Sequence, residues 1–169
     1  MSSDLLVGQF PTNESGFKKK MRFHQGWWRA FVLNEDEGNN PVRAGEKVCN
    51  TILNGIDDAS RKNFLSEQIL KSVLLTIEER KKAGSGIIEE NRLYNNLLSS
   101  QPLCFNFFGE LKTDNDLALK VLQQFWPELT EVRTVMFEYA PEENYTNDNS
   151  AFDVAFDVMI GSQNGLVGL

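Results

Sequence analysis

The spacing of apolar residues changes along this chain, and that change constrains the fold more than any other feature. Over most of the chain apolar side chains recur every three or four residues, which predicts helices. From Val132 to Ile160 they alternate with polar side chains, which predicts strands. We therefore predict an α/β (α+β) fold for a single domain over 1–169. Residues 1–100 are expected to be mainly helical, and residues 101–169 to begin a core of helices and strands.

The predicted helices cover about residues 13–33, 58–83, 87–99 and 115–125. Residues 34–47 are predicted to be a turn-rich loop, and the aromatic-rich residues 101–111 a buried irregular segment. On the first helix one stripe is apolar and is expected to pack inward: Phe17, Met21, His24, Trp28 and Val32. The adjoining stripe is largely cationic: Lys18, Arg22, Gln25 and Arg29.

The strand pattern places two carboxylates near each other. One strand is predicted from Val132 to Tyr139 and a second from Ala151 to Ile160, with a hairpin at 161–165 and a third strand from 166. Glu138 lies at the end of the first strand, and Asp153 lies on the second. Two carboxylates at one sheet edge could hold Mg²⁺ for hydrolysis of a phosphodiester. The alternative is that Asp153 is a turn-facing or salt-bridged structural residue.

Charge is distributed unevenly along the chain, whose net charge is −7. Residues 1–33 hold five basic and two acidic side chains, whereas residues 110–169 hold three basic and eleven acidic ones. The basic side chains of the first helix are candidates for contacts with nucleic-acid phosphates: Lys18, Lys19, Lys20, Arg22 and Arg29. For both charged regions the alternative is a solvated surface.

Composition excludes several classes of site. One His and two Cys cannot form a four-ligand structural zinc site, and Cys49 and Cys104 are expected to be free thiols in a reducing cytoplasm. No phosphate-binding loop, dinucleotide-binding glycine motif or nucleophile elbow is present. We expect a cytoplasmic protein with no membrane partner, because no apolar run approaches the roughly 20 residues that a membrane helix needs.

Several stretches resemble a bacterial family assigned to the PD-(D/E)XK nuclease superfamily. They are Arg22 to Arg29, Asn63 to Leu65, Arg92-Leu93, Asn96 to Gly109, Phe137-Glu138 and Ser150 to Asp153, of which the block Asn-Leu-Leu-Ser-Ser-Gln-Pro-Leu-Cys-Phe-Asn is the most specific. The resemblance implies a restriction-endonuclease-like core with a mixed sheet behind a helical N-terminal region. It also implies Mg²⁺-dependent hydrolysis of DNA, with Asp153 as motif aspartate and metal ligand. Glu138 falls in the matching Phe-Glu stretch, and Glu89 or Glu90 could supply a further helix carboxylate.

The resemblance places a Glu-x-Lys motif on the third strand, where the sequence would continue after Leu169. We therefore expect the core to be incomplete at its C-terminus and the 169-residue chain to be inactive or severely impaired. Lys112 and Lys120 are the nearest lysines that could substitute, which we consider a poor fit. An unfinished sheet edge would also favour a homodimer. The alternative function is a non-catalytic DNA-binding or protein-interaction module, with Trp27 or Trp28 packing or stacking.

Overall fold

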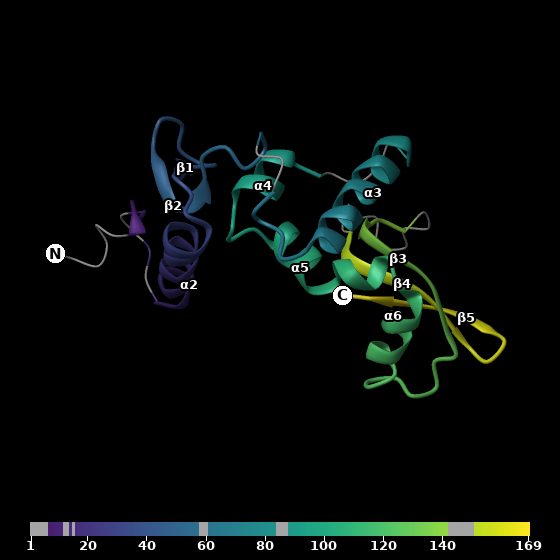
Figure 1. Ribbon diagram of the computed structural model, residues 1–169. Helices are drawn as coiled ribbons and strands as arrows, with labels where there is room; N and C mark the ends of the chain where they lie inside the picture. The colour runs from purple at the N-terminus through teal and green to yellow at the C-terminus, as the bar shows by residue number, and fades with distance from the viewer. Residues whose placement is uncertain (1–6, 12–13, 15, 58–60, 84–87, 142–150) are drawn as a thin grey trace. The chain divides into compact units, whose positions relative to one another are not determined.

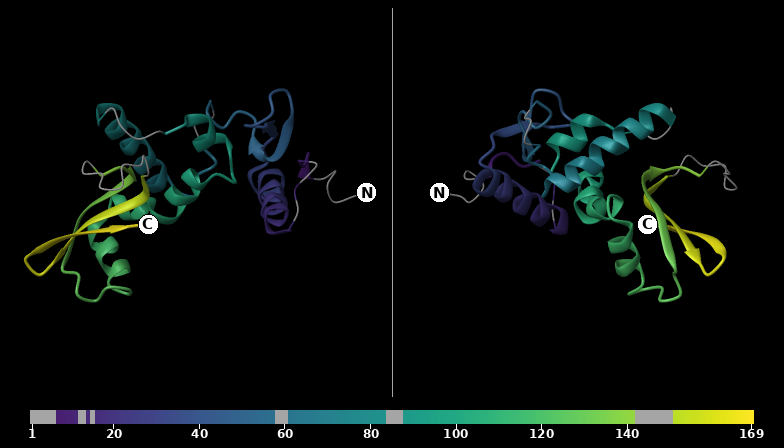
Figure 2. Two further views of the ribbon diagram at one scale, coloured as in Figure 1. Left: turned by 180° about the vertical axis from the view of Figure 1, so that it is seen from behind. Right: turned by 45° about the vertical axis from the view of Figure 1, so that its right-hand side comes forward.

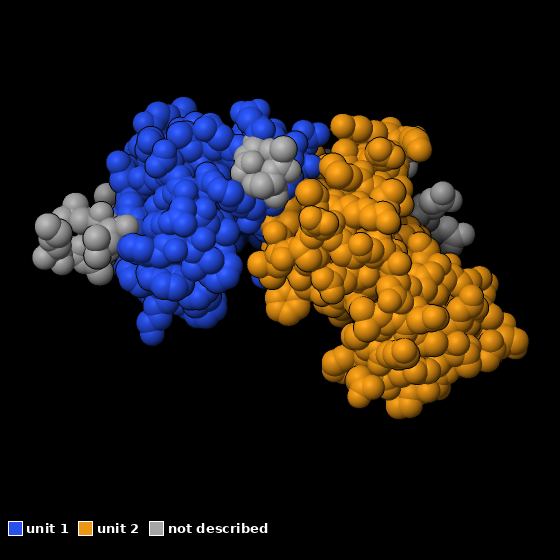
Figure 3. All heavy atoms as spheres, in the orientation of Figure 1, with its two compact units in different colours: residues 1–63, 89–103 blue, residues 64–88, 104–169 orange. Residues whose placement is uncertain are grey.

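The computed structural model of the chain shows helices together with two small antiparallel sheets (Figure 1). It describes all residues except 1–6, 12–13, 15, 58–60, 84–87 and 142–150. The chain divides into two compact units (Figure 3). The first unit comprises residues 1–63 and 89–103, and the second comprises residues 64–88 and 104–169. No helix in the described ranges is both long and apolar enough to cross a membrane.

The first unit combines helices with a two-stranded sheet. Its elements are α2 (Gly16–Trp27), the π-helix η1 (Trp28–Leu33), β1 (Glu37–Asn39), β2 (Lys47–Ile52) and α4 (Glu90–Asn95). The π-helix ends at Asn34, which adopts the left-handed conformation with a φ of 52°. Strands β1 and β2 pair antiparallel within and beside the segment predicted to be a loop, so that prediction is wrong there.

Helix α2 packs on β2 at Arg22, which bonds the Asn50 side chain, and at Gly26. A side chain at Gly26 would place its Cβ 3.0 Å from the Cβ of Cys49, so the absence of one lets the helix approach the strand closely. Arg29, one turn further on, is only 5% exposed. The predicted inward stripe is wrong at both ends, because Phe17 is 75% exposed and Val32 is 42% exposed.

The second unit places helices on one side of a three-stranded sheet (Figure 2). Its helices are α3 (Glu67–Ala83), α5 (Ser100–Lys112, of which residues 104–112 belong here) and α6 (Asn115–Leu122). Its strands pair antiparallel in the order β3 (Glu131–Tyr139), β4 (Phe152–Ile160) and β5 (Gln163–Gly168). The described sheets are thus antiparallel, while the predicted combination of helices and strands, a mixed α and β fold, is confirmed.

The core of the second unit joins α5 to the sheet. The sheet contributes buried apolar residues from two neighbouring strands: Val135, Phe137, Val154, Phe156 and Val158. The ring of Phe105 stacks on Phe137 with 4.2 Å between centroids, and Phe108 meets Phe156 edge to face. Helix α3 covers α5 at Gly109, whose carbonyl accepts a hydrogen bond from the Ser72 hydroxyl.

Helix boundaries differ from the prediction for local reasons. Residues 101–111 form most of α5 rather than an irregular segment, because Pro102 falls in the first turn, where a helix tolerates its missing N–H. Helix α3 begins later than predicted because the Ser66 hydroxyl caps it, accepting a hydrogen bond from the Ile69 amide at 3.2 Å. Helix α4 stops earlier because Asn96 is extended and its side chain accepts from the Leu98 amide.

Candidate metal centre

Glu138 and Asp153 occupy facing positions on neighbouring strands. In the antiparallel pair of β3 and β4, Phe137 is the partner of Val154 and Tyr139 is the partner of Phe152. The residues between these partners, Glu138 and Asp153, therefore lie opposite each other. Asp153 is exposed and Glu138 is half-buried.

The backbone at Glu138 adopts an unusual conformation. Its φ is 51°, in the left-handed region that residues other than glycine rarely occupy. Such a conformation costs roughly 1–3 kcal/mol and persists only where surrounding packing enforces it. Phe137, the preceding residue, provides that packing, since it is 1% exposed beneath α5.

The thiol of Cys104 lies near both carboxylates. Burial raises the pKa of Cys104, and the negative charges of Asp153 and Glu138 raise it further, to about 12. Cys104 precedes Phe105, the residue that stacks on Phe137, so α5 positions the thiol over this end of the strand pair. Both charges act on one buried thiol, which indicates that the two carboxylates converge on the same region of the unit.

Arg80 brings a positive charge to the same end of the strands. It lies in the last turn of α3, and its Nη1 donates to the carbonyl oxygen of Glu138 at 3.5 Å. Its Nε is buried and has no hydrogen-bond partner among the described residues. A buried guanidinium N–H without an acceptor is costly.

The second aspartate of β4 is arranged differently. Asp157 accepts a hydrogen bond from Arg133 of β3 at 3.0 Å, and Arg133 also donates to the side chain of Asn164 on β5. In this cross-strand network the positive charge of Arg133 balances the negative charge of the Asp157 carboxylate. Asp153 and Asp157 thus share a strand but not an environment.

The donor set at Glu138 and Asp153 fits a hard divalent cation. Carboxylate oxygens are the ligands that Mg²⁺ prefers, and Mg²⁺ is commonly held by one or two carboxylates while it keeps several waters. In the part of the chain that the structure describes, no group of three or more His, Cys, Asp or Glu side chains could hold a metal. Among the described His, Cys, Asp and Glu side chains, this place therefore offers fewer than three that could hold a metal together.

The structure places the remaining candidate acids in the first unit. Glu89 caps α4, where its carboxylate accepts a hydrogen bond from the Arg92 amide at 3.2 Å. Glu90 lies in the first turn of the same short helix.

The Lys112 ammonium group is already bound within the second unit. Lys112, considered from the sequence as a poor substitute for the missing lysine, donates to the Glu79 carboxylate at 2.8 Å and to the Val135 carbonyl oxygen at 3.0 Å.

Two of the five basic candidates, Arg22 of α2 and Arg29 of η1, serve the structure of the first unit. Arg29 donates to the carbonyl oxygens of Cys49 at 2.8 Å and Val7 at 3.0 Å, and also to that of Glu35. Arg22 forms a bidentate pair with Glu14, with donor–acceptor distances of 2.5 and 2.8 Å. The Arg22 guanidinium holds the pKa of Glu14 below its usual value through these bonds.

The other three basic candidates are exposed. Lys18, Lys19 and Lys20 all lie on the solvent side of α2, and only a 3.7 Å contact from Lys18 to Glu14 is recorded among the described ion pairs of this run. These three lysines are therefore the basic candidates that remain available to contact phosphates, since Arg29 is buried and donates its hydrogen bonds to carbonyl oxygens.

Sequence reasoning missed Arg80 and Cys104 as neighbours of the carboxylates. In the sequence Arg80 is a basic residue near the C-terminus of a predicted helix. The favourable interaction of such a residue with the helix dipole explains its presence without any role at the carboxylates. Cys104 falls in the segment predicted to be irregular, where no periodicity defines the direction of its side chain. The proximity of both depends on how α3 and α5 pack on the sheet.

Comparison with known proteins gives one match. The family model described as PD-(D/E)XK nuclease superfamily matches residues 12–169. No curated protein and no solved structure matches the chain.

Proposed function

Because the chain belongs to the PD-(D/E)XK nuclease superfamily, we propose that its second unit is the metal-dependent centre of a nuclease that hydrolyses DNA. The observation that carries this proposal is the facing position of Glu138 and Asp153 on β3 and β4. When bound, a divalent cation such as Mg²⁺ acidifies a water ligand and neutralises charge on the phosphodiester.

The chain's own residues divide the work at this centre. Asp153, the exposed member of the pair, presents carboxylate oxygens to the cation. Glu138 supplies the second carboxylate from a backbone held in a strained conformation, which fixes where its side chain begins. The positive charge of Arg80 limits the repulsion between the two carboxylates and attracts an incoming phosphodiester.

Hydrolysis needs further groups. Strand β5, with the sequence Gln-Asn-Gly-Leu-Val-Gly, carries neither a carboxylate nor a lysine. The acid and the lysine of the superfamily's Glu-x-Lys motif are therefore not supplied by this strand as described. We propose that cation binding needs β3 and β4, whereas the chemical step needs those two groups as well.

Cleavage of DNA by protein that includes a Glu-x-Lys strand tests the proposal. We expect Mg²⁺-dependent cleavage of supercoiled, linear or single-stranded DNA that EDTA abolishes and that Asp153→Asn lowers by about a hundredfold or more. Asp157→Asn on the same strand is the matched control and should retain activity, because Asp157 is paired with Arg133. Absence of Mg²⁺-dependent cleavage of every DNA form would contradict the nuclease proposal.

A second candidate function is DNA binding by α2 without catalysis. It is favoured by the exposure of Lys18, Lys19 and Lys20, and by the exposure of two aromatic rings further along the chain. Trp27 is 43% exposed and Phe31 is 49% exposed, and their centroids are 6.0 Å apart. Lysines that contact phosphates and rings that stack on bases are typical of nucleic-acid-binding surfaces.

Two further expectations stay proposals. Cys49 and Cys104 are free and buried, as we would expect of a protein that acts in a reducing cytoplasm. Strand β5 pairs with β4 alone among the described strands, so its other edge could pair with a second copy. Measuring the mass of the protein in solution by light scattering tests the homodimer, and a monomer at high concentration would contradict it.

A further inference from the structure

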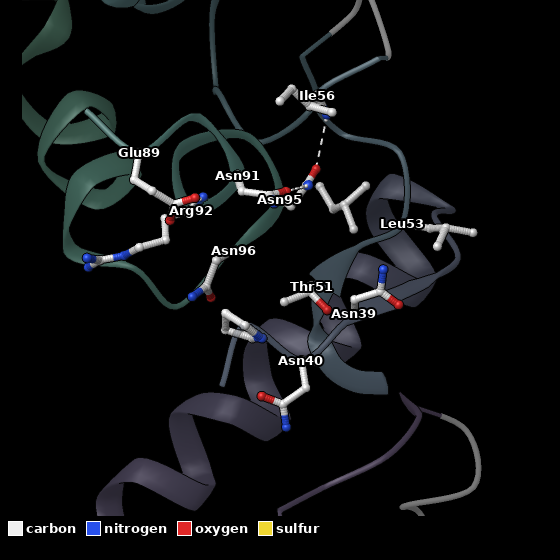
Figure 4. Close-up of a pocket in the computed structure, with 12 residues that line it drawn as sticks. Asn39, Asn40, Thr51, Leu53, Ile56, Glu89, Asn91, Arg92, Asn95 and Asn96 are labelled. Atoms are coloured by element: carbon white, nitrogen blue, oxygen red, sulfur yellow. Dashed lines mark hydrogen bonds between the residues drawn. The ribbon is translucent and has the colours of Figure 1, made fainter. Parts of the chain in front are cut away.

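The first unit contains a polar cavity, lined in part by Glu89 and Arg92 of the α4 segment. Its volume is about 440 Å³, within the usual range of sites for small molecules. The loop after β1, strand β2 with the turn that follows it, and helix α4 form its walls (Figure 4). These walls are held together by an isolated bridge between Thr51 and Asn96 and by a hydrogen bond from the Leu97 amide to the Asn50 carbonyl at 3.0 Å.

Five asparagine side chains dominate the lining, and the oxygens of all but Asn39 accept hydrogen bonds within the described part of the chain. The Asn40 oxygen accepts from the amides of Val42 and Arg43 at 2.9 and 3.3 Å. The Asn96 oxygen accepts from the Leu98 amide at 3.0 Å and from the Asn50 side chain at 2.8 Å. The oxygens of Asn91 and Asn95 are likewise occupied, by the Asn95 amide group at 2.7 Å and by the Ile56 amide at 3.0 Å.

The side-chain nitrogens of most of these asparagines, in contrast, remain available as hydrogen-bond donors. Within the described part of the chain, the side-chain nitrogens of Asn40, Asn91 and Asn96 have no hydrogen-bond partner, whereas that of Asn95 is used. Figure 4 shows that the side chains of Asn40 and Asn96 come from different walls of the cavity, Asn40 from the loop after β1 and Asn96 from the residue after α4. Since each amide group offers two N–H donors, the cavity presents donors with few matching acceptors.

This imbalance selects the chemistry of a ligand. A metal ion requires several oxygen ligands, and four of the five asparagine oxygens of the lining already accept hydrogen bonds. A sugar offers hydroxyl groups that donate as well as accept, so it would leave its own donors without partners. A nucleotide offers acceptors on its base and its phosphate, and asparagine is a usual partner of base edges. The apolar side chains of Leu53 and Ile56, both half-buried, can cover the face of a base.

We propose that this cavity binds a single nucleotide, either free or as one residue of a nucleic-acid strand. Asn40 and Asn96 donate to the base, and the Arg92 guanidinium at the rim pairs with the phosphate. Glu89 and Arg92 give the lining no net charge, so the donors rather than the overall charge provide the selectivity. The proposal does not depend on the metal centre of the second unit.

Substitution of asparagine by aspartate tests the donors and spares the internal bonds. Asn96→Asp and Asn40→Asp replace the free nitrogen by an oxygen and keep the oxygen that accepts from the backbone. Binding of AMP, GMP, CMP and UMP, and of the uncharged nucleosides, is measured by titration calorimetry. We expect each variant to lose about tenfold or more in affinity for the preferred nucleotide and its nucleoside. Loss of nucleoside binding cannot be ascribed to repulsion of a phosphate.

Asn164→Asp is the matched control, because it adds the same charge in the second unit and keeps the oxygen that accepts from Arg133. It should bind nucleotides like the unchanged protein. If a short single-stranded oligonucleotide binds more tightly than the mononucleotide, and Asn96→Asp weakens both by the same factor, the natural ligand is a residue of a nucleic-acid strand. Mononucleotide binding without oligonucleotide binding identifies a free nucleotide. Binding of inorganic phosphate alone, no binding of any mononucleotide at millimolar concentration, or equal binding by Asn96→Asp would overturn the proposal.

Discussion

Glu138 faces Asp153 across the strand pair, and it does so with a backbone φ of 51°. The two properties belong together, because a left-handed residue interrupts the regular alternation of a strand and redirects the side chain at that point. Buried Phe137 on one side and the paired Tyr139 on the other hold the backbone in register around it.

Glycine at position 138 should relieve the backbone strain at that position. Because glycine adopts a positive φ without strain, Glu138→Gly should leave the free energy of unfolding unchanged or raise it by up to about 1 kcal/mol. At Glu131, an exposed position of the same strand, the same change should lower stability by about 1 kcal/mol. Urea denaturation measures both, and equal destabilisation of the two variants would show that Glu138 is not strained.

Arg29 should contribute to stability rather than to nucleic-acid binding. Lysine at this position would satisfy fewer of the three carbonyl oxygens that Arg29 now bonds, so Arg29→Lys should lower the free energy of unfolding by about 2–3 kcal/mol. Arg43→Lys, in an exposed pair with Glu46, is the control and should change it by less than about 0.5 kcal/mol. Similar unfolding curves for the two variants would refute the buried role.

The exposed lysines of α2 predict a specific salt dependence. If Lys18, Lys19 and Lys20 contact phosphates, their replacement by glutamine should reduce the slope of log affinity against log salt by roughly two to three units. Fluorescence anisotropy with labelled DNA measures this slope. The control replaces three exposed lysines elsewhere, Lys47, Lys71 and Lys120, by glutamine. An unchanged slope in the first variant would exclude α2 as the phosphate-binding surface.

Acid should weaken the first unit through Glu14. Hydrogen bonds from Arg22 lower the pKa of Glu14 in the folded protein. The stability contributed by this pair is therefore fully present above the ordinary glutamate pKa, about 4.3, and is lost as pH falls through the lower folded value. The stability difference between the wild-type protein and Glu14→Gln should shrink between pH 6 and pH 3. Glu46→Gln is the exposed control, and a difference that does not vary with pH would contradict this role.

Alternation of residue types made the strands of the second unit predictable. The predicted strands match β3 and β4 closely because Val135, Phe137, Val154 and Phe156 must all face the helices. Glu138 and Asp153 could be placed on neighbouring strands for the same reason. Their exact opposition could not, since it depends on a register irregularity between Val132 and Thr134.

Packing on α2 could not be predicted from periodicity. The pattern of large apolar residues favoured Phe17 and Val32, but the packed face contains a glycine and an arginine, Gly26 and Arg29. This contact depends on the close backbone approach that Gly26 permits and on the hydrogen bonds from Arg29 to carbonyl oxygens. Neither interaction produces a hydrophobic pattern in the sequence. Residues 101–111 were mispredicted because a first-turn proline and dense aromatics conceal a helix.

Titration with Mn²⁺, followed by the relaxation of water protons, tests the metal centre most directly. We predict that the unchanged protein binds Mn²⁺ and that Asp153→Asn and Glu138→Gln each weaken binding by about tenfold or more. Asp157→Asn, whose carboxylate is held by Arg133, should stay within about twofold of the unchanged protein. Equal Mn²⁺ affinities for Asp153→Asn and Asp157→Asn would show that the pair formed by Glu138 and Asp153 is not a metal site.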